Sequence, residues 1–284
     1  MFAADPESSR AASRKTRVYV FREFLLDQYN LEKGDVVLDV AGGAGTLSWL
    51  LNNVDGVDSV VVDPRKTKTN RITKSIAFLR EHPDEACDRA IPSRRSYQPL
   101  AALMPKLAKK QNFVNPRHLR ILVDEHLVEA VRLYLHSLEN ENEHENGIEE
   151  WIEYWKQALE RGKSADTLGY REEETISSTE IIDADIALQT ILEVKLIIGF
   201  HPDQATDSCI DLARELGVPF CIVPCCVFPS QFPHRKLPNG NRVQRYDQLL
   251  EYLKTKDENV VTAKLPFNFT DTAKNIALFT INNL

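Results

Sequence analysis

The fold is decided by residues 36–63, which read VVLDVAGGAGTLSWLLNNVDGVDSVVVD. A short apolar run enters a turn rich in glycine and alanine, 39–45, and a further apolar run follows at once. A β-branched run, 59–62, then ends at Asp63. A strand, a turn, a helix and a second strand within about 30 residues predict a βαβ unit of a parallel sheet.

The rest of the chain extends this unit into one domain over 17–284, after an N-terminal tail, 1–16, that is expected to be disordered. A helix is expected from Val18, and a mainly helical insertion at about 64–180, in which 119–123 fits a third strand or the start of a helix. Helices are then predicted at 184–192, 209–216 and 246–253, strands at 195–200 and 218–223, and an antiparallel pair at 260–265 and 276–281. The fold class is therefore α/β: a Rossmann-like, doubly wound, mostly parallel seven-stranded sheet with an antiparallel last strand.

Charge is distributed unevenly along the 284 residues. The formal net charge is -7, but residues 64–120 carry 14 Lys/Arg against four acids, a net +10, so the remainder carries -17. Such asymmetry is typical of a polyanion-binding surface, here RNA, although a solvated helical face is the alternative. The candidate substrate-binding residues are Arg94, Arg95, Lys109, Lys110 and Arg235.

The five cysteines are an odd number, concentrated late in the chain without a secretory leader, which favours a reducing, intracellular compartment. The cytoplasm is the first expectation, with mitochondrion and nucleus as alternatives. A mitochondrial presequence is disfavoured by Asp5 and Glu7. No apolar run is long enough to predict a membrane helix, and the oligomeric state is not predicted.

The glycine turn and Asp63 together predict a nucleoside-containing ligand. Small residues at 41, 43 and 45 allow the backbone to approach a ligand closely, and the spacing differs from that of dinucleotide-binding turns. An acid at the end of the second strand can accept both hydroxyls of a ribose. The alternative is an ordinary strand–helix turn with a solvated carboxylate.

The chain here resembles the class I S-adenosylmethionine-dependent methyltransferases, whose first motif is similar to residues 39–45, with Ala41 in place of the usual first glycine. The antiparallel last strand is a further similarity. The resemblance implies S-adenosylmethionine as cofactor, held by the turn and by Asp63 on the ribose. The implied cofactor residues are Asp39, Ala41, Gly42, Gly43, Gly45 and Asp63, with Asp124 for the adenine amine if 119–123 is the third strand.

Two later strand ends carry polar groups that could meet the methyl acceptor. His201-Pro202-Asp203 follows one strand, and Pro224-Cys225-Cys226 follows the next. The pair resembles the methyltransferase group that includes the methyltransferase-like-25 proteins and the acceptor-stem tRNA ribose methyltransferases, although the residues that follow each motif differ. His201 or Asp203 could take a proton from the acceptor. The alternatives are a backbone hydrogen bond for His201 and a helix cap for Asp203.

Cys225 is the third candidate catalytic residue, with three interpretations for it and Cys226. A thiolate could attack a pyrimidine base. A zinc ion could be held together with Cys221, Cys209 or His234, although adjacent cysteines lack the usual ligand spacing, and no metal is expected. The third interpretation is small thiols that shape a pocket.

The sequence thus predicts an S-adenosylmethionine-dependent methyltransferase that acts on an RNA base or ribose. One alternative is a protein or small-molecule acceptor, with the insertion as a lid. Another is a methyltransferase fold without catalysis that serves as an RNA-binding or assembly factor. A nicotinamide dehydrogenase is disfavoured by the spacing of the turn and by the reversed last strand.

Overall fold

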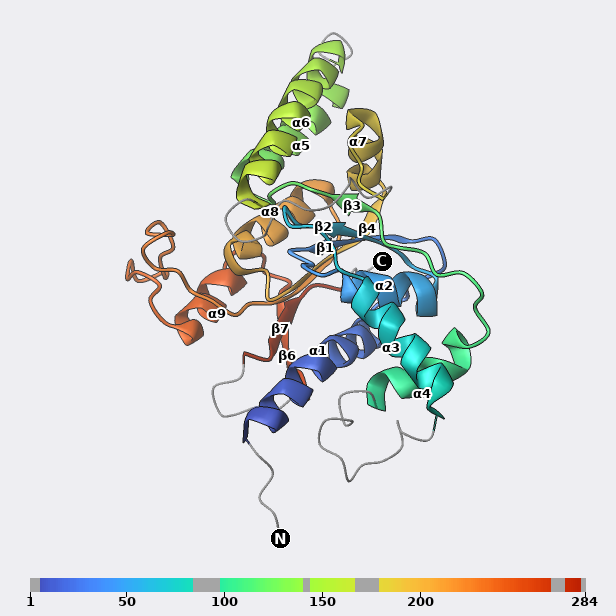
Figure 1. Cartoon of the computed structure of the whole chain (residues 1–284). Coiled ribbons are helices and arrows are strands. Elements are labelled where there is room, and N and C mark those ends of the chain that lie inside the picture. The colour runs from blue at the N-terminus through green and yellow to red at the C-terminus, as the bar shows by residue number, and fades with distance from the viewer. Residues whose placement is uncertain (1–5, 84–97, 140–143, 167–178, 267–273, 282–284) are drawn as a thin grey trace.

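The structure is a computed structural model that describes residues 6–83, 98–139, 144–166, 179–266 and 274–281 (Figure 1). Its seven-stranded sheet has the order β3-β2-β1-β4-β5-β7-β6. The strands are β1 (Val36–Val40), β2 (Asp58–Val62), β3 (His118–Leu119), β4 (Val194–Phe200), β5 (Phe220–Val223), β6 (Val261–Lys264) and β7 (Ile276–Phe279). Neighbours from β3 to β5 are parallel, and β7 is antiparallel to both β5 and β6. The Rossmann-like α/β fold with a reversed last strand is confirmed.

Helices cover both faces of the sheet (Figure 1). The group on one face comprises α1 (Pro6–Gln28), α2 (Thr46–Leu50), α3 (Asn70–Glu81) and α4 (Gln98–Leu107). Helix α2 continues directly into the π-helical turn η1 (Leu51–Asp55). The second group comprises α5 (Glu125–Glu139), α6 (His144–Asp166), α7 (Ala184–Leu192), α8 (Thr206–Leu216) and α9 (Tyr246–Lys254). None of the helices in the described part of the chain combines the length and the apolar composition that crossing a bilayer requires.

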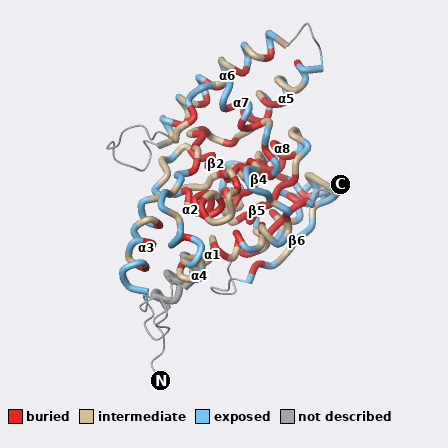
Figure 2. The backbone as a smooth tube through the Cα atoms, turned by 90° about the vertical axis from the view of Figure 1, so that its right-hand side faces the viewer, coloured by how far each residue is buried: buried red, intermediate tan, exposed pale blue. Residues whose placement is uncertain are grey.

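The sheet is buried on both faces, as Figure 2 shows for the central strands. In β1, Leu38 and Val40 belong to the core formed with α5–α9. Val37, between them, belongs to the core formed with α1 and α2. Alternate side chains of a strand point to opposite faces, so an unbroken apolar run is what a central parallel strand needs.

The third strand, β3, is shorter than predicted. The sequence of 119–123 fits either a third strand or the start of a helix. Strand β3 pairs with β2 only through His118 with Val61 and Leu119 with Val62, and His118 also forms an isolated bridge with Glu180. Because β2 ends at Val62, residues after Leu119 have no parallel partner. The chain therefore leaves the sheet there and enters α5.

The predicted boundaries differ from the observed ones in two further places. The helix α1 begins at Pro6, within the tail that was expected to be disordered, whereas residues 1–5 lie outside the described residues. The described residues of 64–180 form α3, α4, α5 and α6, and they also contribute β3 to the sheet. In chain order, β3 lies between α3–α4 and α5–α6.

A buried ion pair joins α1 to the end of the βαβ helix. The Arg22 guanidinium donates from Nε to Oδ2 of Asp55 at 2.6 Å and from Nη2 to Oδ1. Only 5% of the Arg22 side chain and 8% of the Asp55 side chain are exposed. Removal of one partner leaves a desolvated charge, which costs more than the pair contributes.

We expect Asp55→Ala to lower the free energy of unfolding by about 3 kcal/mol, because Arg22 stays buried without its partner. Urea denaturation measures this change. The matched control is Glu160→Ala, which breaks a pair with Lys163 that is mostly exposed, and it should cost less than about 1 kcal/mol. Equal losses in the two variants would contradict the prediction.

Candidate functional site

The candidate site lies where the carboxyl ends of four parallel strands meet. The sheet order places β2 on one side of β1 and β4 on the other, so the connections leave β1 and β4 in opposite directions. Ligands of open α/β sheets bind at such a switch point, outside the carboxyl ends of the strands. The glycine turn follows β1, Asp63 follows β2, His201 follows β4 and Cys225 follows β5.

The glycine turn uses left-handed backbone conformations at alternate residues. The φ angles are 54° at Ala41, 56° at Gly43 and 73° at Gly45. A Cβ at Gly45 would lie 3.2 Å from the Thr67 side chain, so this glycine is required by packing. A Cβ at Gly43 would lie 3.9 Å from the Arg65 side chain, so no atom crowds the backbone there. The close approach of a ligand to this turn remains a prediction.

The buried side chain of Asp39 packs against the glycine turn. Its carboxylate is 1% exposed and accepts a hydrogen bond from Ser48 Oγ at 2.8 Å. A Cβ at Gly42 would lie 2.7 Å from Asp39 Oδ2, which explains why glycine occupies that position. Burial raises the pKa of Asp39 to about 7, and the Asp63 charge adds a smaller increase. The role of Asp39 as a cofactor residue remains a prediction.

Asp63 is fully buried and holds the turn against β2. Its Oδ2 accepts a hydrogen bond from the Gly43 amide at 2.9 Å. The side chain of Arg65 also binds it, with Nε 3.0 Å from Oδ1 and Nη2 2.9 Å from Oδ2. The Arg65 side chain is 51% exposed, whereas that of Asp63 is 0% exposed. Arg65 thus covers the carboxylate that the sequence assigns to a ribose.

Asp124 has a structural role that sequence reasoning missed. Its Oδ1 accepts a hydrogen bond from the Leu127 amide at 3.1 Å, in the first turn of α5. Its Oδ2 lies 4.0 Å from Nη2 of Arg161 on α6. These contacts account for the carboxylate, and its assignment to the adenine amine, which depended on a longer third strand, receives no support.

The two polar residues after β4 both have strained backbones, with φ angles of 62° at His201 and 49° at Asp203. His201 Nε2 lies 3.2 Å from the Lys274 carbonyl oxygen, which can only accept, so Nε2 carries the proton. Burial lowers the pKa of His201, and the Arg17 charge lowers it further. The ring is therefore neutral at pH 7. The alternative of a backbone hydrogen bond for His201 is the one observed.

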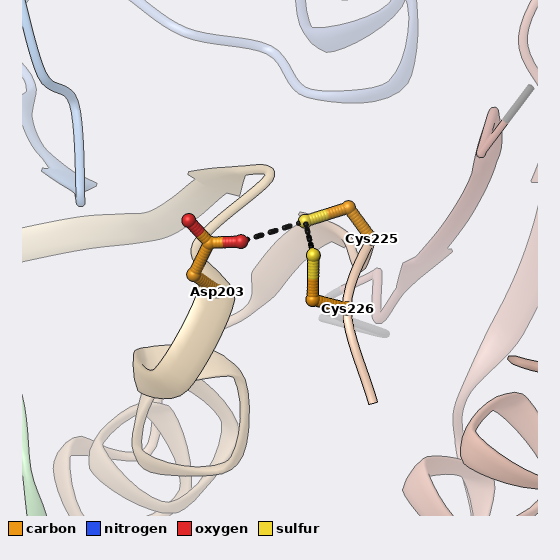
Figure 3. Close-up of side chains that lie close together, drawn as sticks. All are labelled: Asp203, Cys225 and Cys226. Carbon is orange, nitrogen blue, oxygen red and sulfur yellow. Dashed lines mark hydrogen bonds between the residues drawn. The ribbon is translucent and has the colours of Figure 1, made fainter. Parts of the chain in front are cut away.

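Asp203 is exposed and lies beside both cysteines (Figure 3). Cys225 Sγ donates to Asp203 Oδ1 at 2.9 Å, and the sulfurs of Cys225 and Cys226 lie 3.4 Å apart. Helix α8 begins without a side-chain cap, so the capping alternative for Asp203 is not observed. Burial raises the pKa of the Cys225 thiol well above its usual range, and the bond to Asp203 adds to this. Such surroundings disfavour a free thiolate nucleophile.

The zinc alternative that included Cys209 or Cys221 is not formed. Cys209 is buried in the core with α5–α9, and Cys221 is buried in the core on the other face of the sheet. In the part of the chain that the structure describes, one group of three possible metal ligands has donor atoms within 4.8 Å of one another. Its members are Asp203, Cys225 and Cys226.

The structure buries Arg235, which the sequence assigns to substrate binding. The residue is 1% exposed, and its guanidinium pairs with Asp207 and donates to the Val227 carbonyl at 2.7 Å. It also stacks on the Phe232 ring at 3.8 Å. Arg235 therefore links the loop after β5 to α8. A buried guanidinium needs a carboxylate and carbonyl oxygens as hydrogen-bond partners, and these contacts supply them.

The other candidate RNA-binding residues differ in their exposure and in their contacts within the fold. Lys109 is exposed, whereas Lys110 donates from Nζ to the Asn53 carbonyl at 3.0 Å and is partly buried. Arg94 and Arg95 lie outside the described residues. Arg117 pairs with Asp58 at 2.6 Å, so part of the basic segment is used within the fold.

Exposed basic side chains remain on two helices that pack together and in the turn after the second. They are Arg71 and Lys74 on α3, Lys106 on α4 and Lys109 in the turn just after α4. The two helices share an apolar core that includes Ile76 and Leu107. We call these four residues the basic face.

Comparisons with known proteins do not extend this description. No protein-family model matches the chain, and a search of curated proteins found no significantly similar sequence. The functional interpretation therefore depends on the fold and on the geometry of the site.

We expect stability to depend on the ionisation of Asp39. The folded protein keeps the proton up to about pH 7, whereas the unfolded chain releases it near 3.8. Between these two pH values the unfolded state binds fewer protons than the folded state. The contribution of Asp39 to the free energy of unfolding is therefore fully present below about pH 4 and is lost as the pH rises towards 7.

Asp39→Asn keeps an acceptor for Ser48 but cannot ionise. The variant should be more stable than the wild type at about pH 8, and the difference should vanish at about pH 4, as measured by urea denaturation at both pH values. Asp27→Asn, at an exposed position on α1, is the control that should show no such gain. A wild type that is more stable than Asp39→Asn at pH 8 would overturn the assignment.

Proposed function

We propose that the chain is an S-adenosylmethionine-dependent methyltransferase that acts on RNA. The observation that carries the first part is the combination of a reversed β7 between β5 and β6 with a glycine turn and a buried acid at the ends of β1 and β2. The reversed strand resembles the class I methyltransferases, and the turn and acid lie where such a cofactor would bind.

The residues of the turn fit the proposed cofactor. Gly43 could leave space for a ligand against its backbone, since a Cβ there would have its nearest contact, the Arg65 side chain, at 3.9 Å. The Arg65 guanidinium supplies two N–H donors to the two oxygens of Asp63. Two adjacent ribose hydroxyls would supply an equivalent pair of donors, so Asp63 has the acceptor geometry that the sugar requires.

Arg65 must leave Asp63 before a ribose can bind there. Its side chain is half exposed, so the guanidinium can move into solvent, and the ribose hydroxyls would replace its hydrogen bonds to the buried carboxylate. The Gly43 amide and the Asp63 carboxylate remain in place, because both are fixed to β1 and β2. The turn would thus hold the nucleoside without a change of fold.

The residues after β4 and β5 would meet the methyl acceptor. The cofactor supplies an activated methyl group, and the chain must align the acceptor and remove its proton where the acceptor is a hydroxyl or an amide. The Asp203 carboxylate is the more exposed of the two candidate proton acceptors after β4. Partly buried His201, whose Nε2 donates to a carbonyl oxygen, would then fix the position of the loop.

The basic face supports RNA as the acceptor. Arg71 and Lys74 belong to the helix that follows directly on the segment after Asp63, so a nucleic acid bound to α3 and α4 lies near the cofactor edge of the sheet. Phosphate contacts of this kind give affinity without sequence preference.

Calorimetric titration with S-adenosylmethionine tests the cofactor. The wild type should bind, and Gly43→Val should weaken binding about ten- to hundredfold, because the side chain fills the space that the ligand needs. The matched control is Gly217→Val, which has a similar backbone, φ 64° against 56°, but ends α8 away from the turn. A wild type that does not bind, or equal losses in both variants, would contradict the proposal.

Salt titration of RNA binding tests the basic face. We expect the affinity of the wild type for single-stranded RNA to fall steeply with salt, and Arg71→Ala combined with Lys74→Ala to reduce the slope of log K against log salt by about 1.4. Lys163→Ala, on α6, is the control that should leave the slope unchanged. A flat salt response of the wild type would exclude phosphate contact.

A further inference from the structure

Three ligand-type side chains meet at the ends of two neighbouring strands. Phe200, the last residue of β4, pairs with Val223, the last residue of β5. The loops that follow therefore leave the sheet side by side, and they bring Asp203 next to Cys225 and Cys226 (Figure 3). All three donor atoms lie within 4.8 Å of one another.

The separations are close to those that a tetrahedral zinc ion imposes. Zinc–sulfur bonds of about 2.3 Å at a tetrahedral angle place two sulfurs about 3.8 Å apart, and a carboxylate oxygen about 3.5 Å from each sulfur. The observed distances are 3.4 Å between the sulfurs and 2.9 Å from Cys225 Sγ to Asp203 Oδ1. Insertion of the ion requires the donors to separate by about half an ångström, which small rotations of the side chains provide.

The chemistry of the donors selects a borderline-soft cation. Two sulfurs and one carboxylate oxygen suit zinc, whereas magnesium and calcium require oxygen ligands. The site is open to solvent, since Asp203 is exposed and both cysteines are partly buried, so an ion can enter. Without a cation, burial and the neighbouring carboxylate raise the pKa of Cys225. A bound divalent cation would instead stabilise the thiolate form of the cysteines, so its binding would release the thiol protons.

The groups around the cluster are compatible with a bound cation. The Lys274 charge favours the thiolate of Cys226, and the Tyr246 hydroxyl lies near Cys225. Nε2 of His201 is already bonded to a carbonyl oxygen. Within the described residues, no fourth side chain joins the group, so one coordination position stays open, as in catalytic rather than structural zinc sites.

We propose that Asp203, Cys225 and Cys226 form a binding site for a zinc-class divalent cation with one open coordination position. Water or an acceptor oxygen would fill that position, and the cation would lower the pKa of the group bound there. This site goes beyond the function proposed above, because binding of the ion does not require methyl transfer. It also revises the expectation from sequence that no metal is bound.

Cobalt titration of the full-length chain tests the site. The protein is reduced with a phosphine, freed of metal with a chelator, and its free thiols are counted. Added Co²⁺ should then produce sulfur-to-cobalt charge-transfer absorption that saturates near one ion per chain and is abolished by Zn²⁺. Cys225→Ser combined with Cys226→Ser should remove the absorption. Asp203→Asn should keep it while weakening affinity at least about tenfold.

The matched control is Cys209→Ala, which removes a thiol that lies in the core with α5–α9 and should leave the absorption intact. Thermal unfolding of the metal-free variants establishes that each one folds. Absence of charge transfer in the fully reduced wild type would overturn the proposal, as would its persistence in the double serine variant. Calorimetric binding of S-adenosylmethionine is a separate readout, so loss of one property is distinguishable from loss of the other.

Discussion

The structure depends on the position of β1 between two parallel neighbours, β2 and β4. All five residues of β1 are buried, and its ladder partners run from Asp58 to Val62 on one side and from Val194 to Ile198 on the other. Because all three strands point the same way, their carboxyl ends open on a single edge of the sheet. The parallel direction of the strands therefore brings the glycine turn, Asp63 and the polar loops to the same edge.

At that edge, Asp63 links the end of β2 to the glycine turn after β1. Its carboxylate binds the Gly43 amide across two strands and also binds the Arg65 side chain. The carboxylate is thus held by the backbone of the turn and by a partly exposed arginine. At the same edge of the sheet, the loops after β4 and β5 form a second cluster of different chemistry, in which Asp203 lies beside Cys225 and Cys226. In the proposed function, the first cluster would bind the nucleoside and the second would face the methyl acceptor.

The sequence predicts the sheet well and the roles of polar side chains less well. Unbroken apolar runs such as Val36-Val37-Leu38 and the glycine spacing depend on local chain properties, so strands, turn and reversed last strand could be predicted. The short β3 could not, because its length is set by where β2 ends. The ion pairs of Arg235 and Asp124 could not be predicted either, since their partners, Asp207 and Arg161, are brought close only by tertiary packing. The pairing of Asp203 with Cys225 depends on strand order in the same way, but Arg65, two residues after Asp63, could have been identified from the sequence.

The most direct measurement is a crystal structure of the protein with S-adenosylhomocysteine, the product form of the proposed cofactor. We expect the two ribose hydroxyls to bind Asp63, the ligand to lie against the backbone of Gly43, and the Arg65 side chain to have moved away from the carboxylate. A ligand bound elsewhere, or no bound ligand together with an intact Arg65–Asp63 pair, would contradict the assignment of this edge as a methyltransferase site.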